Sequence, residues 1–286
     1  MESLKAEATV RAREANFQLL QELLERALSR RGGGMATGLD TARLEAQLEN
    51  ERHNLSVVRY EVDRLQVNLI HAMGIPFDVR VILTDQLQTD IPHVPTIPEA
   101  VSTAIANRAE IKAQTQRIRT ASLTLKSTES ERIPSLVGQG DYGLIGNRVH
   151  NTLDTYNVAA LLSIPIFDGG QREGRISESR SQVRQETIRM QVVANQVVLE
   201  VREALITLAS AREQFGIAQS GLKAALTELV LARERFSVLT SGNNLELTNA
   251  TFSLARAREN AVDAMFRLNA SRVNLARGTG QLEKLQ

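Results

Sequence analysis

The sequence lacks cysteine and tryptophan, and only 3% of its 286 residues are aromatic. Without cysteine the chain has no disulfides and no thiolate ligands for a metal. The scarcity of aromatic side chains deprives a compact core of its usual large fillers. These absences argue against an ordinary globular domain.

An excess of one sign of charge is also lacking, because the sequence has 34 basic and 33 acidic residues and contains no basic tract. The balance gives no electrostatic reason to expect nucleic acid as a partner. Gly32-Gly33-Gly34 follows a predicted helix and lacks the Lys-Ser/Thr of a phosphate-binding loop. Four histidines are scattered without metal-ligand spacing: His53, His71, His93 and His150. We therefore expect no enzyme activity, no metal site and no cofactor.

Long apolar runs are missing as well. A membrane-spanning helix needs about 18 apolar residues, whereas the longest candidate, Val158–Phe167, is interrupted by Ser163 and Pro165. The first residues, MESLKAEATVRARE, contain no apolar core of a signal peptide. Any membrane insertion of this sequence is therefore expected to use β-strands.

Helical periodicity dominates what is present. Five segments are predicted as helices, at about residues 2–31, 39–73, 98–132, 171–239 and 244–278. Together they include roughly 205 residues, about double the usual helical share. The chain is therefore predicted to be mainly α.

The fourth segment carries a coiled-coil seam along its whole length. Two series of residues repeat every seven positions and alternate at spacings of three and four, which is the a/d pattern. One series is mostly alanine: Met190, Val197, Ala204, Ala211, Ala218, Ala225 and Ala232. The other is mostly large: Ala194, Val201, Leu208, Phe215, Leu222, Leu229 and Phe236. A helix of this length spans on the order of 100 Å, which is too long for the core of a globular domain.

The fifth segment repeats the pattern and is expected to fold back on the fourth. Its large series is Leu247, Leu254, Ala261, Leu268 and Leu275, and its small series is Ala250, Ala257, Ala264, Ser271 and Gly278. Gly242-Asn243-Asn244 interrupts the chain between the two segments. The interruption predicts an antiparallel helical hairpin.

Residues 133–167 differ from the rest of the chain, because glycine-rich and alternating patterns replace helical periodicity. The predicted first strand places Leu136, Tyr142 and Leu144 on one face and Gln139 and Asp141 on the other. The second strand has a wholly apolar face: Tyr156, Val158, Ala160, Leu162, Ile164 and Ile166. The pattern is typical of a transmembrane β-hairpin with one face towards lipid. A hairpin packed on a soluble domain remains the alternative.

An internal repeat is indicated at an offset of 204 residues. Arg31 matches Arg235, and Gly38, Ala46, Ala72 and Gly74 match Gly242, Ala250, Ala276 and Gly278. The layout of helix, glycine turn and helix recurs with them, which indicates a duplication. We expect residues 1–97 to be the remainder of a first repeat (a helical hairpin and a linker) and residues 98–286 to be the second. At least about 100 residues of the first repeat are expected to be missing before Met1.

Three motifs resemble the TolC-like outer membrane efflux protein family. They are Ile164-Pro165-Ile166-Phe167-Asp168-Gly169-Gly170 at the strand-to-helix junction, the run from Pro98-Glu99-Ala100 through Asn107-Arg108-Ala109-Glu110-Ile111 to Arg132-Ile133-Pro134, and Gly74-Ile75-Pro76. At the junction, Pro165 ends strand hydrogen bonding, Asp168 can cap the next helix, and Gly169 and Gly170 permit a change of direction.

The resemblance implies long antiparallel helices of the α-barrel tunnel type and one transmembrane β-hairpin, where the family has two. It implies a trimeric outer-membrane export duct, passive in transport, with the helices in the periplasm and the strands against outer-membrane lipid. An inner-membrane transporter and a periplasmic adaptor would be the partners. The adaptor would dock at the helical tips near Gly38, Gly242 and Asn243.

The same resemblance places a ring of acidic side chains at the periplasmic aperture. Glu246 keeps the carboxylate there, whereas Asn249 replaces a second one with an amide. The competing interpretation is that Glu246 only interacts with the dipole of its helix. A soluble periplasmic coiled-coil scaffold or adaptor and a non-functional truncated remnant remain alternatives for the whole chain.

Overall fold

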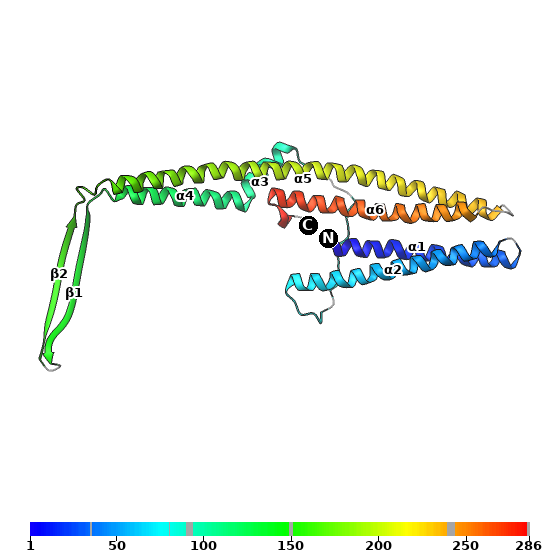
Figure 1. Cartoon of the computed structure of the whole chain (residues 1–286), viewed down its shortest axis with the longest axis horizontal. Coiled ribbons are helices and arrows are strands. Elements are labelled where there is room, and N and C mark those ends of the chain that lie inside the picture. The colour runs from blue at the N-terminus through cyan, green and yellow to red at the C-terminus, as the bar shows by residue number, and fades with distance from the viewer. Residues whose placement is uncertain (35, 80, 90–93, 149–150, 239–243, 285–286) are drawn as a thin grey trace. The chain divides into compact units, whose positions relative to one another are not determined.

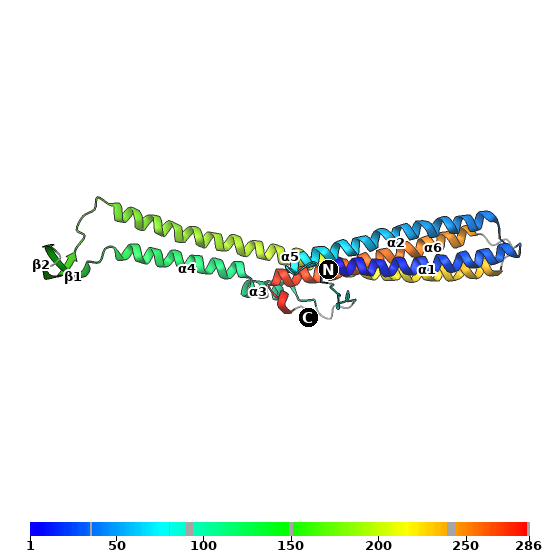
Figure 2. The same cartoon turned by 90° about the horizontal axis from the view of Figure 1, so that it is seen from below.

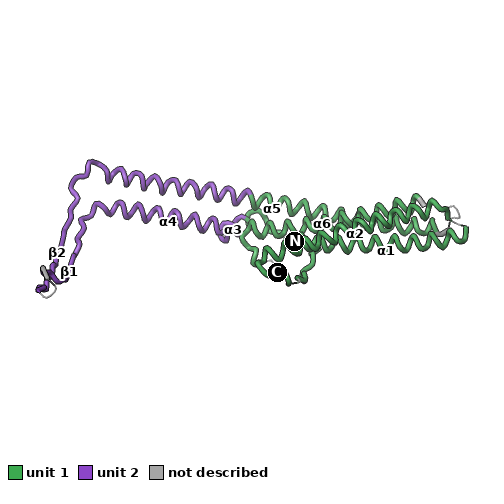
Figure 3. Tube along the Cα trace, turned by 60° about the horizontal axis from the view of Figure 1, so that its bottom comes forward, with its two compact units in different colours: residues 1–100, 200–286 green, residues 101–199 purple. Residues whose placement is uncertain are grey.

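The computed structural model describes the chain except for residues 35, 80, 90–93, 149–150, 239–243 and 285–286. The chain divides into two compact units (Figure 3). Unit 1 consists of Met1–Ala100 and Glu200–Gln286, and unit 2 consists of Val101–Leu199. The division follows packing, so the predicted boundary between repeats at residue 98 stays a prediction.

Unit 1 is a set of antiparallel helices. It contains α1 (Glu2–Gly32), α2 (Gly38–Met73), α6 (Asn244–Thr279), the short 3-10 helix η1 (Leu282–Lys284) and the C-terminal part of α5 (Gln171–Val238). Helix α1 packs against both α2 and α6 (Figures 1 and 2). The first helical hairpin, α1–α2, therefore lies beside the second, which is formed by α5 and α6.

The core of unit 1 is built from the predicted seam. One cluster of buried apolar side chains joins all four helices: Leu19, Leu20, Leu23, Ala27, Leu44, Ala225, Leu229, Ala232, Leu247, Ala250 and Leu254. The α5 residues in this cluster belong to both predicted seven-residue series. At the far end of α6, a Cβ atom on Gly278 would lie 4.0 Å from the Val201 side chain, so the two helices meet there at an ordinary van der Waals distance. The coiled-coil prediction is confirmed.

The two hairpins of unit 1 end in matching ways. Helix α2 begins at Gly38 and α6 at Asn244, and the left-handed glycines that follow them are Gly74 (φ 66°) and Gly280 (φ 69°). Both pairs are 206 residues apart. Each glycine and the residue after it donate backbone hydrogen bonds to the last turn of their helix, which is the usual way a left-handed glycine closes a helix. The structural repeat therefore runs at 206 residues, and the offset of 204, which paired Gly74 with Gly278, was wrong by two.

Unit 2 contains most of α3 (Ile97–Asn107), α4 (Ala109–Ser130), two strands and the N-terminal part of α5. The single helix predicted over 98–132 was wrong, because the backbone of Arg108 is extended (φ −63°, ψ 133°). Its guanidinium pairs with the Glu110 carboxylate at 2.9 Å. Helix α3 begins one residue before the predicted start, and the Thr96 amide donates to the Glu99 carboxylate at 2.8 Å.

Helix α4 runs beside the first part of α5 (Figure 1), and polar contacts are frequent between them. Gln114 is buried and donates to the Glu186 carboxylate at 2.7 Å and to the Glu186 backbone carbonyl at 3.0 Å. Thr128 and Ser179 are also buried, with their hydroxyl oxygens 3.4 Å apart. This pair of helices is held by hydrogen bonds as much as by apolar contact.

The two strands, β1 (Ser135–Arg148) and β2 (Asn151–Ser163), form an antiparallel hairpin. Tyr142 pairs with Tyr156 and Leu136 with Leu162, while Asp141 pairs with Asn157. Because side chains alternate between the faces of a strand, the predicted apolar residues of β1 and β2 lie on the same face of the hairpin. Among the described residues, no helix is long and apolar enough to cross a membrane.

Candidate functional site

The first helical tip is shaped by a cap and an arginine. Thr37 and Asp40 form a reciprocal capping box: the Asp40 amide donates to Thr37 Oγ1 at 3.3 Å, and the Thr37 amide donates to the Asp40 carboxylate at 2.9 Å. Arg31 donates to Thr41 Oγ1 at 3.3 Å across the turn. The guanidinium of Arg31 lies 3.7 Å from the position that a Cβ atom would take on Gly38. A Cβ atom at Gly38 would therefore make an ordinary van der Waals contact with this guanidinium.

The second tip carries the predicted aperture residue. Glu246 lies in the first turn of α6 and pairs with Arg235 of α5 at 3.1 Å. The neighbouring Leu247 and Ala250 are fully buried, which fixes the position of Glu246, whereas Asn249 is exposed. The carboxylate thus has a cationic partner that the sequence did not reveal. Gly242 and Asn243, the other predicted tip residues, lie outside the described residues.

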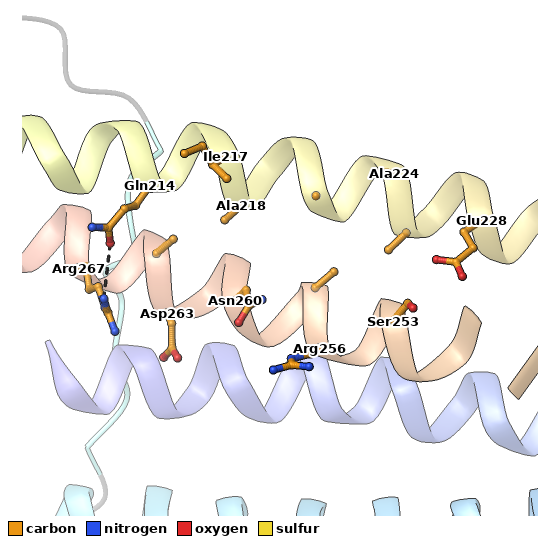
Figure 4. Close-up of a pocket in the computed structure, with 14 residues that line it drawn as sticks. Gln214, Ile217, Ala218, Ala224, Glu228, Ser253, Arg256, Asn260, Asp263 and Arg267 are labelled. Carbon is orange, nitrogen blue, oxygen red and sulfur yellow. Dashed lines mark hydrogen bonds between the residues drawn. The ribbon is translucent and has the colours of Figure 1, made fainter. Parts of the chain in front are cut away.

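A groove of ≈ 640 Å³ follows the α5–α6 hairpin (Figure 4). Its walls include small residues on both helices, such as Ala218, Ala224 and Ala257. Charged and polar side chains are distributed along it, and Gln214 accepts a hydrogen bond from Arg267 at 3.5 Å. The mostly alanine seam thus leaves a shallow surface between the helices rather than an enclosed active site.

The strand-to-helix junction has the geometry that its residues require. The Gly169 and Gly170 φ angles are 67° and 84°, in the region where a side chain is strained. Asp168 accepts hydrogen bonds from the Gly170 amide at 3.2 Å and the Arg172 amide at 3.0 Å, so it caps α5. The ladder ends at the Ser135–Ser163 pair, before Pro165, which has no amide hydrogen to continue it.

The hairpin exposes its apolar side chains. None of the described residues in β1 and β2 is buried, and Tyr142, Tyr156 and Val158 are 73%, 82% and 82% exposed. A contiguous apolar face of this extent marks a surface that meets lipid or another protein.

Gly146 is a residue that the sequence reasoning missed. A Cβ atom there would overlap the backbone carbonyl of Asn151, next to an irregularity in the strand register. A glycine at the end of a strand, just before a polar loop, was the available signal.

Comparison with known proteins extends these observations. Residues 100–281 match the model of the family described as "Outer membrane efflux protein". The chain is 24% identical over 219 residues to "Outer membrane efflux protein BepC" of Brucella suis, over 74% of this chain and 46% of that protein. The chain therefore spans about half the length of this curated relative.

Solved structures share the fold. The outer membrane protein VceC of Vibrio cholerae has a TM-score of 0.74 at 15% identity, over 98% of this chain and 67% of that one. The open-state MtrE outer membrane channel of Neisseria gonorrhoeae has a TM-score of 0.75 at 16% identity, over 98% and 66%. At these identities the likeness establishes the arrangement of helices and strands alone.

Long antiparallel helices joined to an exposed apolar hairpin match the fold of these outer membrane channels. The chain belongs to the outer membrane efflux protein family. This membership assigns it to the cell outer membrane, with its helical part in the periplasm, and favours the channel over a soluble scaffold.

Proposed function

We propose that the chain is part of a trimeric export duct, passive in transport, that works with an inner-membrane transporter and a periplasmic adaptor. Three copies would place β1 and β2 in outer-membrane lipid and their helices around a periplasmic tunnel. The adaptor would contact the tips near Gly38, Gly242 and Asn243. Family membership supports this assignment, and the observation that carries it is the hairpin with one continuous apolar face and no buried residue among those described.

Lipid contact of the hairpin is tested by a pair of charged substitutions. Val158 lies on the apolar face with Tyr142, Tyr156 and Leu162, whereas Ala159 lies on the opposite face with Asp141. A lysine facing lipid near the middle of a bilayer costs about 2–4 kcal/mol. Val158→Lys should therefore reduce the fraction of protein that co-sediments with lipid vesicles several-fold, while Ala159→Lys should leave it near the wild-type value. Equal membrane association of both variants and wild type would rule out the proposed lipid-facing surface.

We further propose that Glu246 contributes to a cation-attracting aperture. Three carboxylates converging on a trimer axis would favour cations, and Arg235 would offset part of their charge through its 3.1 Å pair. In planar bilayers containing the assembled channel, Glu246→Gln should lower the preference for K⁺ over Cl⁻ and Arg235→Ala should raise it. Asn249→Ala, which removes a neutral side chain, serves as the control. If neither variant shifts the reversal potential, Glu246 does not contribute to ion selectivity. Its role is then limited to a favourable interaction with the dipole of its own helix.

A further inference from the structure

A pocket of ≈ 410 Å³ lies within unit 1, between α1, α2 and α6. It is lined by apolar side chains, including Leu19 and Leu20, and by a group of charged and amide side chains: Arg13, Asn16, Gln47, Glu51 and Glu259. The apolar cluster of unit 1 borders it, since Leu19 and Leu20 belong to both. The pocket is thus a polar interruption in an otherwise apolar packing surface.

Ion pairs across the pocket join the two helical hairpins. Arg13 of α1 donates to the Glu51 carboxylate of α2 at 3.0 Å and also pairs with Glu259 of α6. Asn16 of α1 accepts from Arg258 of α6, and burial lowers the pKa of Arg258. The first hairpin is therefore connected to the second through Arg13 and Asn16.

Four polar atoms on the pocket wall are buried without a hydrogen-bond partner among the described protein groups. They are Arg13 Nε, Asn16 Nδ2, Gln47 Oε1 and Glu51 Oε1. Asn16 is only 3% exposed and Glu51 only 6%. A buried polar group that lacks a partner is costly, so four in one pocket indicate that something else satisfies them.

The four atoms are sorted by helix. Both donors, Arg13 Nε and Asn16 Nδ2, belong to α1, and both acceptors, Gln47 Oε1 and Glu51 Oε1, belong to α2. A molecule between them must accept from α1 and donate to α2. The charged side chains that line the pocket balance, since Arg13 and Arg256 stand against Glu51 and Glu259, so the lining favours neither an anion nor a cation. A neutral molecule that both donates and accepts hydrogen bonds meets these conditions, and water is the smallest.

We propose that this pocket is a structural water site, in which bound water molecules bridge the α1 donors to the α2 acceptors beneath the Arg13 ion pairs. Buried waters commonly make about three hydrogen bonds to groups that the protein leaves unsatisfied. The pocket volume is ample for several water molecules. The site stabilises the packing of α1 against α2 within the first hairpin through a hydrated layer, next to the dry layer formed by Leu23, Leu44 and Leu254.

A crystal structure of the full chain, at a resolution that shows ordered solvent, tests the site directly. The proposal expects at least one water within about 2.7–3.2 Å of both an α1 donor and an α2 acceptor. Direct hydrogen bonds from Arg13 Nε or Asn16 Nδ2 to the Oε1 atom of Gln47 or Glu51 would overturn it, as would a side chain or a crystallisation additive in place of the water.

A double-substitution experiment tests it in solution. Asn16→Leu and Gln47→Leu each remove one group that the same water would join, so each should lower Tm by several degrees. The double variant should lower Tm by clearly less than the sum of the two, because the second change finds the bridge already lost. Asn50→Leu, an exposed residue on the pocket wall, should leave Tm unchanged. Strictly additive effects of Asn16→Leu and Gln47→Leu would contradict a shared water bridge.

Discussion

The two compact units differ in how many apolar side chains they bury. In unit 1, the cluster that joins four helices consists of eleven leucine and alanine residues. In unit 2, polar and apolar residues share the few buried positions: Ala104, Ile111, Gln114, Thr128, Ile176, Ser179 and Val197. The strands of unit 2 add apolar side chains that none of the described residues covers.

This difference shows where each unit obtains its stability. Unit 1 removes the leucines of this cluster from water within the chain, and burying a leucine side chain contributes about 1.5–3 kcal/mol. The helices of unit 2 are joined by exposed ion pairs such as Arg175–Glu131 at 2.6 Å, which contribute about 0–1 kcal/mol each. The apolar area of its hairpin can contribute only where lipid or another chain covers it.

Truncating one leucine in each unit tests this contrast and has the largest expected effect. Leu254 is fully buried in unit 1, whereas Leu162 is 60% exposed on β2. Leu254→Ala should reduce stability by about 2–5 kcal/mol, which corresponds to a fall in Tm of roughly 5–15 °C. Leu162→Ala should leave Tm in detergent solution close to wild type. Thermal unfolding followed by circular dichroism measures both, and similar losses would remove the distinction between the units.

Two glycines near the start of α5 should respond to alanine in opposite directions. Gly170 has a positive φ of 84°, so Gly170→Ala should cost about 1–2 kcal/mol. Gly174 lies within α5, and a Cβ atom there would meet no other group within 4 Å. Gly174→Ala should therefore stabilise the first turns by up to about 1 kcal/mol. Amide hydrogen exchange over residues 171–178 measures the difference, and exchange that changes in the same direction in both variants would contradict the assigned junction geometry.

Lowering the pH should weaken the packing of α4 against α5, by less than the substitutions above change stability. The hydrogen bond from Gln114 lowers the pKa of Glu186, with desolvation opposing it and Arg189 assisting. A lowered folded-state pKa stabilises the fold above the unfolded value, and this contribution is lost as pH falls through the folded value. Amide protection in residues 109–130 should therefore decline as pH falls below about 4.5. Gln114→Leu should make this decline in amide protection shallower. The same pH dependence in the variant and in wild type would mean that the hydrogen bond does not make the α4–α5 contact sensitive to pH.

The regular parts of the fold could be predicted because the sequence repeats its own pattern. Seven-residue spacing from Met190 to Phe236 predicted the seam that the structure buries, and alternation from Tyr156 to Ile166 predicted the apolar face of β2. The sharp change of direction at Gly169 and Gly170 could also be predicted. Both residues have a positive φ, a conformation that few residues other than glycine adopt.

Other features depend on contacts that local patterns do not encode. The break at Arg108 has no glycine or proline to announce it, and its ion pair with Glu110 is visible only in three dimensions. The Arg235 partner of Glu246 and the pocket beside Arg13 likewise join residues far apart in sequence or on different helices. The repeat offset was wrong by two because chance identities such as Gly74 with Gly278 outweighed the helix ends.

We propose that one face of β2 meets lipid while the other does not. Because the chain has no cysteine, single cysteines can be placed at each position from 154 to 162 and spin-labelled without a background signal. In lipid vesicles, oxygen accessibility should alternate with a period of two, high at positions 156, 158, 160 and 162 and low at the positions between them. Accessibility that is uniform along β2, or high to a water-soluble nickel complex at positions 156, 158, 160 and 162, would contradict a lipid-facing hairpin.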